Sequence, residues 1–336
     1  ASAGQCGGWG CCLPSVLVSK YQKMEETMEQ EDKGLGEQVQ HSGFVAVIGR
    51  PSSGKSTFLN TLCGIKVSIV SPVPQTTREC IRAIYNGSDV HIVFLDTPGI
   101  HQSIREYNKR LSDVALEAVK DADAILCLHD VSRAIGEEDD HIFGWLGDYA
   151  AKTIVVCNKL DLSGPGMIEE RMHEIREKIT PHEILTISAF KKDDVLRVVE
   201  VLKPLLAQGP RYYPDDYYTD QTQEFRIAEI IREKIFLQMR DEIPHASCVL
   251  VDKVDYNERS ESVRIEATIY VEAQSQKGMI IGAKGVMIKE IGMMARRDLE
   301  DIFGYPVHLF LNADVKHGWR KDTKFLQLLD RQYQRH

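Results

Sequence analysis

The residues with the clearest chemistry form a glycine-rich loop. Residues 49–56 have the sequence GRPSSGKS and fit the pattern G-x-x-x-x-G-K-[ST]. An apolar run precedes the loop and an amphipathic run follows it, so we expect a strand before it and a helix after it. Glycines let the backbone close around phosphates, and N–H groups at the start of a helix face the anion. Lys55 is then placed to reach the β- and γ-phosphates, and the Ser56 hydroxyl to ligate Mg²⁺.

Two further segments would complete a phosphate and metal site. The sequence DTPG at 96–99 ends an apolar run. Asp96 is expected to hold Mg²⁺ through water, and the Gly99 N–H to sense the γ-phosphate. In the preceding segment, 71–78, Thr77 is predicted to close over the metal and the γ-phosphate as a first switch, with Thr76 as the alternative. The predicted metal ligands are Ser56, Thr77 and Asp96, and the predicted catalytic residues are Lys55, Thr77 and Gly99.

Two more segments predict how the base of the nucleotide is bound. The sequence NKLD at 158–161 follows an apolar run, as does SAF at 188–190. A carboxylate at Asp161 can accept hydrogen bonds from N1–H and the 2-amino group of guanine, which adenine lacks, so it would select GTP. A backbone N–H at 188–190 can bind the guanine O6. The predicted nucleotide contacts are Gly49, Arg50, Pro51, Ser52, Ser53, Gly54, Lys55, Ser56, Thr57, Asp96, Thr97, Pro98, Gly99, Ile100, Asn158, Lys159, Asp161, Ser188, Ala189 and Phe190.

The residue after the DTPG segment bears on the reaction rate. It is Ile100, where many small GTPases have a glutamine that orients the attacking water. An aliphatic side chain cannot orient water. We therefore expect either slow intrinsic GTP hydrolysis or a water held by the backbone and by another group.

Strands and helices alternate along the part of the chain that carries these segments. Strands are predicted at 44–49, 81–86, 90–96, 124–130, 153–158 and 184–188, and helices near 105–121, 137–150, 168–179 and 192–207. Several strands are continuous apolar runs, which is typical of a parallel sheet covered on both faces. The chemistry-bearing segments follow the carboxyl ends of these strands, where doubly wound sheets bind ligands. We predict a doubly wound α/β P-loop GTPase domain, similar to Ras, at 42–207.

Composition limits the class of protein. The chain has 336 residues, of which 43% are hydrophobic and 27% charged, and its net charge is −9. This length favours two domains, and the apolar content excludes a disordered chain. The sequence has no run of 18 apolar residues, which excludes a transmembrane helix of that kind. An overall basic nucleic-acid binder is excluded as well, but a local basic face is not.

A second domain is predicted after residue 222. Residues 208–222 contain two prolines, a glycine and four tyrosines, and are predicted to be a linker. The pattern beyond them is helix 224–240, strands 247–256 and 262–271, a helix that ends near 281, a helix at roughly 286–303, and strand 307–315. The sequence GAKG at 282–285 lies between the last two helices. A GxxG loop in an α-β-β-α-α-β order is typical of a type II KH domain, a small α+β fold that clamps single-stranded nucleic acid. We predict this domain at 223–336.

Charge in the second domain favours RNA as the ligand. Residues 221–336 carry 18 basic and 18 acidic side chains, but 277–297 carry five basic side chains and one acidic one. The tail from 316 is also basic. Such a cluster around a GxxG loop indicates phosphate binding. The predicted RNA-binding residues are Lys277, Gly282, Ala283, Lys284, Gly285, Lys289, Arg296 and Arg297.

Residues 1–41 are predicted to be a disordered extension, because they are acidic and lack periodicity after Val18. A metal site at Cys6, Cys11 and Cys12 is not favoured, since no further Cys or His lies nearby at ligand spacing. The other five cysteines lie singly in apolar surroundings, which is typical of reduced thiols in a cytoplasmic protein.

Taken together, residues 42–330 resemble the Era GTPases, which join a Ras-like domain to a C-terminal KH domain. The resemblance rests on the segments above and on PQTTR at 74–78, YYP at 212–214, TDQ at 219–221, AEIIREK at 228–234 and QKGMIIGAKG at 276–285. It implies binding of GTP and GDP with Mg²⁺, and binding of the 3′ end of small-subunit ribosomal RNA in assembly of the 30S particle. It also implies a cytoplasmic protein that associates peripherally with the inner membrane. We further expect a monomer.

One departure from the Era pattern concerns potassium. The family's phosphate loop usually has Asn-Val where this chain has Ser52-Ser53. In related GTPases that asparagine is linked to a bound K⁺ near the β- and γ-phosphates. A serine oxygen is a poorer ligand at that reach, so K⁺ stimulation is expected to be weak or absent. Two alternatives stay open: an Era-like GTPase acting on another RNA such as tRNA, and a non-enzymatic RNA-binding module with a degenerate nucleotide pocket.

Overall fold

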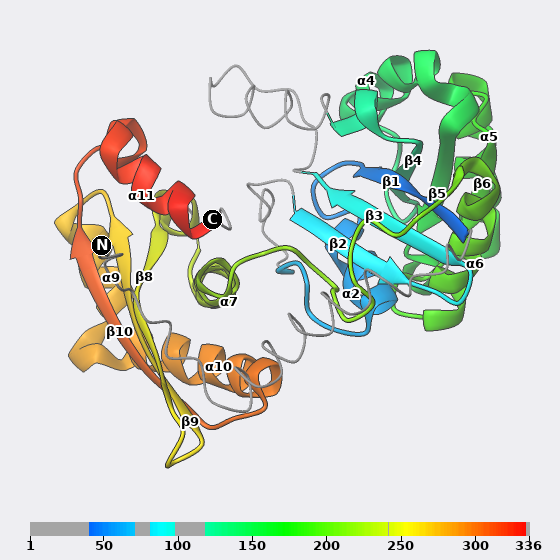
Figure 1. Ribbon diagram of the computed structural model, residues 1–336. Helices are drawn as coiled ribbons and strands as arrows, with labels where there is room; N and C mark the ends of the chain where they lie inside the picture. The colour runs from blue at the N-terminus through cyan, green and yellow to red at the C-terminus, as the bar shows by residue number, and fades with distance from the viewer. Residues whose placement is uncertain (1–39, 71–80, 98–117, 241, 334–336) are drawn as a thin grey trace, which may run out of the picture. The chain divides into compact units, whose positions relative to one another are not determined.

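The computed structural model describes residues 40–70, 81–97, 118–240 and 242–333, and these divide into two compact units (Figure 1). The first unit ends at Gln221, and the second begins at Thr222. Each unit has its own β-sheet and its own hydrophobic core. Among the described helices, none is long and apolar enough to cross a membrane.

The sheet of the first unit has the strand order β2-β3-β1-β4-β5-β6. Strand β2 is antiparallel to β3, and the other strand pairs along this path are parallel. The strands are β1 (Gln40–Ile48), β2 (Ile81–Asn86), β3 (Val90–Asp96), β4 (Ala124–Asp130), β5 (Thr153–Asn158), β6 (Glu183–Thr186) and the short β7 (Gln208–Gly209). Four of the six predicted strands have the predicted bounds. Every residue of β4 and β5 is buried, as expected for central strands covered on both faces.

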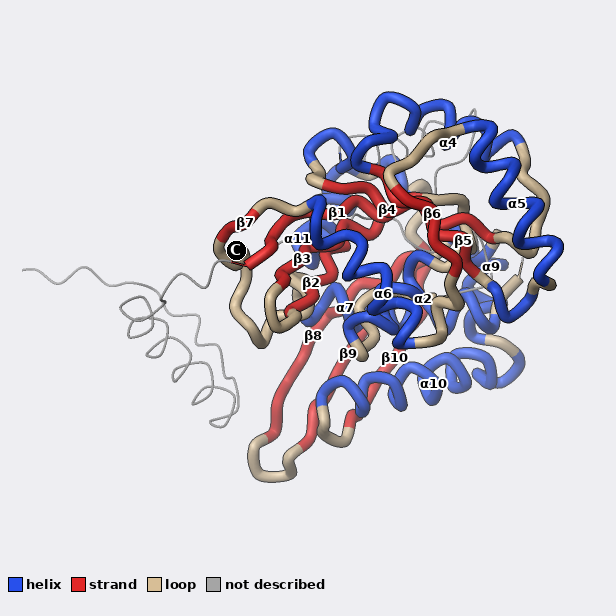
Figure 2. The backbone as a smooth tube through the Cα atoms, turned by 90° about the vertical axis from the view of Figure 1, so that its right-hand side faces the viewer, coloured by secondary structure: helices blue, strands red, loops and turns tan. Residues whose placement is uncertain are grey.

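Helices cover both faces of this sheet (Figure 2). They are α2 (Lys55–Cys63), α4 (Glu137–Leu146), α5 (Pro165–Lys178) and α6 (Lys192–Leu202). Ile142 and Phe143 of α4 pack with Ile125 and Cys127 of β4 in one continuous core cluster. The helix predicted at 137–150 ends at 146 and continues as the 3₁₀ helix η1 (Gly147–Lys152). The helix predicted at 105–121 lies mostly outside the described residues, and only 118–121 are seen as helix.

Two boundaries of the first unit differ from the prediction. Gln40 and His41, predicted within the N-terminal extension, belong to β1, because they pair with β7. Strand β7 in turn begins the segment that was predicted to be a linker. The prediction of disorder and the cysteine cluster at 6–12 otherwise lie outside the described residues.

The segment 208–221 packs along the first unit. The side chain of Asn86, at the end of β2, donates to the carbonyls of Asp215 (2.9 Å) and Tyr217 (3.1 Å). The Ile84 N–H donates to Tyr218, and Thr219 pairs with Ala83 in an isolated bridge. These contacts place the segment beside the edge strand of the sheet. It is therefore held by β2 over much of its length.

The second unit has a three-stranded sheet in the order β10-β9-β8, in which β9 is antiparallel to β8 and parallel to β10. Its elements in chain order are α7 (Gln223–Gln238), α8 (Ile243–Ala246), β8 (Cys248–Asn257), β9 (Ser262–Val271), α9 (Gln274–Ile281), η4 (Ala283–Gly285), α10 (Val286–Phe303), β10 (Val307–Val315), η5 (Trp319–Lys321) and α11 (Thr323–Tyr333). Apart from the short α8, η4 and η5 and the C-terminal α11, this is the predicted order.

Alternate residues of β8 face two different cores. Val249 and Val251 pack with α7 and α10, whereas Cys248 and Leu250 pack with Trp319 and α11. The tail, which was predicted to be basic, contains an amphipathic helix, α11, that covers the second face of the sheet. The free cysteines among the described residues are Cys63, Cys127, Cys157 and Cys248.

Candidate nucleotide and RNA sites

The phosphate-binding loop connects β1 to α2 and has the shape expected of an anion cradle. Gly54 caps the start of α2 with φ +101°. A Cβ at this position would lie 2.1 Å from the Asn158 side-chain nitrogen, so the loop closes to its neighbour only because glycine is present. Lys55 Nζ donates to the carbonyls of Gly49 and Arg50, both at 3.1 Å. The lysine that is predicted to bind phosphates is therefore held at the mouth of the loop.

A buried carboxylate lies beside this lysine. Asp96 is fully buried at the end of β3, and its Oδ2 accepts a 3.1 Å hydrogen bond from the Ser56 hydroxyl. Its Oδ1 has no hydrogen-bond partner among the described residues. Burial raises the pKa of Asp96, and burial lowers the pKa of Lys55, although each group's charge opposes the shift of the other. An unpaired buried carboxylate oxygen beside a serine hydroxyl fits a hard cation such as Mg²⁺.

The guanine end of the predicted site is tied to the phosphate end by one side chain. Asn158, at the end of β5, donates from Nδ2 to the Ser53 carbonyl (2.9 Å) and accepts from the Ala189 N–H (2.9 Å). It is 2% exposed. This buried amide connects the phosphate-binding loop, β5 and the 188–190 segment. It fixes three of the predicted motifs relative to one another.

The residues predicted to bind the base itself lie together at the surface. Asp161 is exposed, and its Oδ1 accepts from the Ser188 hydroxyl at 2.7 Å. The Ser188 N–H donates to Asp194 at 2.8 Å. Phe190 is 74% exposed beside them. The carboxylate predicted to select guanine is thus accessible and oriented by the segment predicted to bind O6.

One further carboxylate of this region was not predicted from the sequence. Asp130 ends β4 and accepts from Lys159 Nζ at 2.7 Å. Hydrogen bonds from Lys159 and Ser132 lower its pKa, although burial opposes them. Its position at the carboxyl end of a buried strand, like those of Asp96 and Asn158, is the signal that could have identified it.

Several other predicted residues take up structural positions around the loop. Thr97 is buried and its hydroxyl donates to the Val47 carbonyl at 2.8 Å. Ser52 has φ +62°, and the buried Ser53 hydroxyl has no hydrogen-bond partner among the described residues. The predicted residues Thr76, Thr77, Pro98, Gly99 and Ile100 lie outside the described residues.

The GxxG loop of the second unit joins α9 to α10 through η4. Gly282 ends α9 with φ +72°, and a Cβ there would lie 2.7 Å from the Met287 Cβ. Gly285 begins α10 with φ +78° and has open space at its Cβ position. Lys284 is exposed and also has a positive φ. The first glycine is therefore required by packing, and the second leaves room for a ligand to approach the backbone.

The basic residues predicted to bind RNA are not equivalent. Lys277 pairs with Asp314 at 3.0 Å, and Arg296 pairs with Glu300 at 3.2 Å. Arg296 and Arg297 lie roughly 16 Å along α10 from the loop, at 1.5 Å per residue. Lys284 and Lys289 are at or near the loop, exposed, and form no ion pair with a described residue. These two lysines are the most direct candidates for phosphate contacts.

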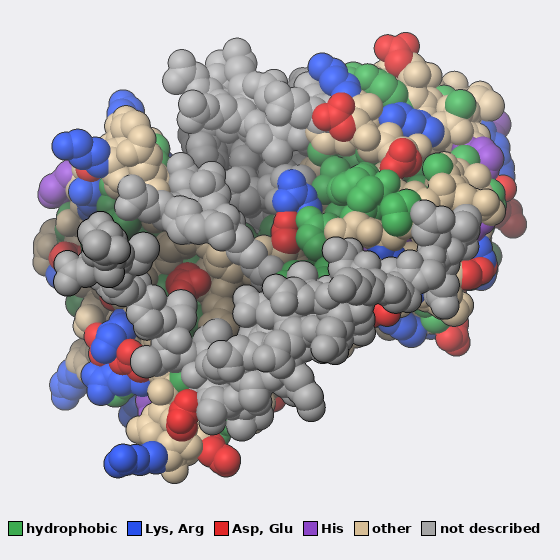
Figure 3. Space-filling model, viewed as in Figure 1, with side chains coloured by type: hydrophobic (Ala, Val, Ile, Leu, Met, Phe, Trp, Pro, Cys, Tyr) green, Lys and Arg blue, Asp and Glu red, His purple; other side chains and the backbone are tan. Residues whose placement is uncertain are grey.

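Further basic side chains of this unit gather around α11. Figure 3 shows Lys and Arg side chains over α11 and the outer edge beside it. The basic residues of η5 and α11 include Arg320, which lies over the Trp319 ring, and the exposed Lys321 and Lys324. Among the described residues, no cluster of three or more His, Cys, Asp and Glu side chains has the arrangement of a metal site.

Two family models match the chain. One, described as a 50S ribosome-binding GTPase, matches residues 44–159, and the other, a KH domain, matches residues 242–320. The first contains the phosphate-binding loop and the start of the guanine motif. The second contains the GxxG loop and the three-stranded sheet.

Similar proteins and structures cover most of the chain. GTPase Era of Geobacter metallireducens is 44% identical over 288 residues, which cover 86% of this chain and 97% of the relative. GTPase Era of Thermotoga maritima is 43% identical over 293 residues, which cover 85% and 96%.

Two crystal structures of Era have the same fold as this chain. A variant of Aquifex aeolicus Era bound to GDP·AlF₄⁻ has a TM-score of 0.79 at 32% identity. Era in complex with MgGDPNP and nucleotides 1506–1542 of 16S ribosomal RNA has a TM-score of 0.79 at 33% identity. Each match covers 86% of this chain and 98% of the other. With its phosphate cradle, guanine motif and GxxG loop in the corresponding domains, the chain belongs to the Era family of GTPases.

Proposed function

We propose that the protein is a GTP-hydrolysing switch that binds the 3′ end of small-subunit ribosomal RNA and assists assembly of the 30S subunit. The observation that carries this proposal is the match, over 86% of the chain, to Era bound to MgGDPNP and a segment of 16S ribosomal RNA. The tRNA alternative is not favoured, because the RNA in that complex is ribosomal.

Residues of the first unit would bind the nucleotide at both ends. The backbone N–H groups of 50–56 and the ammonium of Lys55 would surround the phosphates, and Asp161 would accept hydrogen bonds from guanine. Ser56 and Asp96 would hold Mg²⁺, with Thr77 as a further ligand, and the metal would neutralise charge on the β- and γ-phosphate oxygens. Because Asn158 bonds the Ser53 carbonyl, the two ends of the site keep a fixed separation.

Hydrolysis is proposed to be slow. Ile100 has no group that can orient water, and Gly99 can contribute only its N–H. The segments 71–78 and 96–101 would be ordered by GTP and released after hydrolysis, which makes them the two switches. The state of the two switches then depends on which nucleotide is bound, GTP or GDP, rather than on a high rate of turnover.

The second unit would bind single-stranded RNA at the GxxG loop. Gly285 leaves the α10 N-terminus open, and Lys284 and Lys289 supply positive charge beside it. The N-terminus of a helix attracts a phosphate, so the RNA backbone would pass over this loop. The apolar side chains of Met279 and Val286 flank this loop, are 55% and 54% exposed, and would contact the bases of the RNA.

Three finer proposals come from the resemblance and the loop sequence. We propose a cytoplasmic protein with peripheral contact to the inner membrane, which acts as a monomer. We also propose that it does not depend on K⁺, because Ser52 stands where the family usually has asparagine.

The nucleotide chemistry is tested with two variants. Lys55→Ala should reduce GTP hydrolysis by about 100-fold, since it removes a cation from the developing phosphate charge. Asp161→Asn should weaken GTP binding by about 100-fold and improve binding of xanthosine triphosphate, whose 2-oxo group can accept from the new amide. Equal hydrolysis by the parent and Lys55→Ala would favour a non-enzymatic RNA-binding module. Unchanged base preference in Asp161→Asn would contradict the assignment of the guanine site.

A further inference from the structure

The side chain of Arg50 leaves the phosphate-binding loop and pairs with α4. Its Nη1 lies 2.6 Å from Asp139 Oδ2, and its Nε lies 3.0 Å from Glu138 Oε2. Its backbone carbonyl, by contrast, accepts from the Lys55 ammonium and from the Ser53 N–H. Arg50 therefore links the interior of the loop to a helix that begins 87 residues later in the chain.

Asp139 is the centre of this contact. Its side chain is 4% exposed, and its Oδ2 also accepts from the Gly136 N–H (3.0 Å) at the start of α4. Its Oδ1 lies 3.1 Å from His129 Nδ1 on β4. Burial alone would raise the pKa of Asp139, but the bonds from His129, Gly136 and Arg50 outweigh it and lower that pKa. The carboxylate is thus held ionised between a strand, a helix and the loop.

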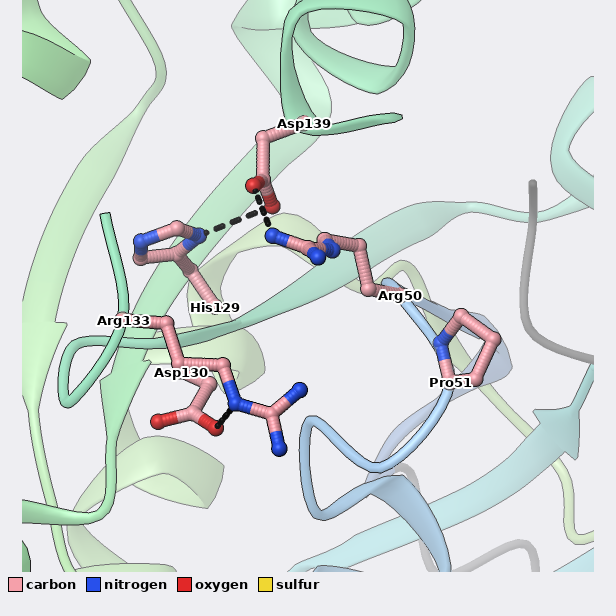
Figure 4. Close-up of a pocket in the computed structure, with 6 residues that line it drawn as sticks. All are labelled: Arg50, Pro51, His129, Asp130, Arg133 and Asp139. Atoms are coloured by element: carbon pink, nitrogen blue, oxygen red, sulfur yellow. Dashed lines mark hydrogen bonds and ion pairs between the residues drawn. The ribbon is translucent and has the colours of Figure 1, made fainter. Parts of the chain in front are cut away.

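Figure 4 shows these groups around a small pocket beside the loop, lined by Arg50, Pro51, His129, Asp130, Arg133 and Asp139. His129 is 2% exposed, and its Nε2 has no hydrogen-bond partner among the described residues. The next residue of β4, Asp130, bonds Lys159 of the guanine motif. Two successive residues of β4 therefore support the two ends of the nucleotide site.

We propose that Asp139 is a positioning residue for the phosphate-binding loop. It holds the loop through the Arg50 guanidinium, and His129 fixes the orientation of the Asp139 carboxylate. Two carboxylates of α4 engage the Arg50 guanidinium, one at Nε and one at Nη1. Its contribution is to fix the backbone carbonyl that receives Lys55. The inference rests on the proposed binding of guanine nucleotide at this loop.

Capping of α4 alone does not explain the arrangement. The helix has acidic residues at each of its first four positions, and the cap needs only one acceptor for the Gly136 N–H. Asp140 is one residue further along the same turn, 52% exposed, and pairs with Lys178. Asp139→Asn and Asp140→Asn each remove one negative charge from the start of α4. Of these two residues, only Asp139 contacts Arg50. Asp140→Asn is therefore a matched control.

The test measures the affinity and dissociation rate of fluorescent GDP, and kcat at saturating GTP, for the full chain and its variants. We expect Asp139→Asn and Arg50→Ala each to weaken GDP binding by about tenfold, with the double variant no weaker than either single variant. Asp140→Asn should match the parent. Arg50→Lys should bind GDP more tightly than Arg50→Ala but less tightly than the parent, since lysine keeps the positive charge but can make only one of the two contacts. At saturating GTP, Asp140→Asn should keep kcat within about twofold of the parent, whereas Asp139→Asn and Arg50→Ala should lower kcat, because they release the carbonyl that holds Lys55.

Additive effects in the double variant, or equal effects of Asp139→Asn and Asp140→Asn, would overturn the inference. If Asp139→Asn does not fold, the comparison of Arg50→Ala with Arg50→Lys decides, and equal GDP affinities of these two would count against it. A parent protein that binds no guanine nucleotide would instead refute the proposed function, and the inference with it.

Discussion

Ser52 stands at a position of the phosphate-binding loop where the backbone is in the left-handed region, with φ +62°. Asparagine adopts this conformation more readily than serine, because its side chain can hydrogen-bond locally. The loop of this chain adopts this conformation with serine in place of the asparagine that the family usually has. What is lost is an amide oxygen that could ligate a cation beside the phosphates.

We therefore predict that GTP hydrolysis by the parent is equal in K⁺ and Na⁺ within about twofold, because a serine oxygen is a poorer ligand for a cation at that reach. Ser52→Asn should introduce a preference for K⁺ of roughly tenfold. The measurement is the single-turnover rate at constant ionic strength, with a bulky organic cation as the reference. Strong stimulation of the parent by K⁺ would contradict this prediction.

Individual site residues differed in how well the sequence predicted them. Lys55, Ser56 and Asp96 belong to short motifs with fixed chemistry, and the fold brings them together as expected. The contacts of Arg50 with Asp139 and of Asp139 with His129 were not predicted. They join side chains from a loop, a strand and a helix, and no local pattern records such a pairing. The switch residue Thr77 remains a prediction.

Helix α2 is bounded by two glycines with positive φ, and they allow a controlled test of the loop. At Gly54 a Cβ would collide with Asn158, whereas at Gly64 (φ +68°) no atom lies within 4 Å of the Cβ position. Both substitutions strain the backbone by a similar amount, about 1–2 kcal/mol. Only the substitution at Gly54 would also push the phosphate-binding loop away from Asn158 of β5.

We predict that Gly54→Ala weakens GDP binding by at least about 100-fold, which corresponds to about 2.7 kcal/mol. Gly64→Ala should lower the free energy of unfolding by about as much as backbone strain lowers it in Gly54→Ala. It should leave GDP affinity nearly unchanged. Isothermal titration calorimetry gives the affinities, and urea unfolding gives the stabilities. Comparable losses of affinity in the two variants would mean that the close contact with Asn158 does not position the loop.

Elements with a strong apolar pattern were predicted almost to the residue. Strands β2 to β5 and β9, helix α10 and strand β10 have the predicted bounds, because burial on one or both faces imposes a clear period. The segment 208–221 was predicted as a linker from its prolines and tyrosines. Its backbone instead bonds to the edge of the sheet, and that partner is more than 100 residues away in sequence. Pairing at such a distance leaves no local signal.

The molecule as a whole separates its two chemistries between its two units. The first contains the nucleotide motifs, and the second contains the GxxG loop with its cluster of positive charge. Only a short stretch of chain separates these contacts in the two units. Asp215, Tyr217, Tyr218 and Thr219 bond to β2, and Thr222 caps α7 by accepting from the Phe225 N–H at 3.2 Å. Strand β2 directly follows the predicted first switch in sequence. We therefore expect the nucleotide state to influence RNA binding.

Two glycines at the ends of α10 provide matched variants for the RNA site. Gly285 (φ +78°) begins the helix and Gly304 (φ +68°) ends it, and neither has an atom within 4 Å of its Cβ position. Gly285→Asp would place a carboxylate where the RNA backbone is expected to pass, whereas Gly304→Asp makes the same change at the other end. We predict that only Gly285→Asp reduces RNA affinity, by at least about tenfold, with GTP hydrolysis unchanged.

The most direct measurement is the affinity of the full chain for a labelled oligonucleotide from the 3′ end of small-subunit ribosomal RNA, with a GTP analogue and with GDP. It is made at two salt concentrations, because phosphate contacts weaken as salt rises. We predict binding at least about tenfold tighter with the GTP analogue than with GDP, a clear loss at higher salt, and a loss with Gly285→Asp but not with Gly304→Asp. Equal affinity in the two nucleotide states would contradict the switch, and no binding in either state would contradict the ribosomal RNA target.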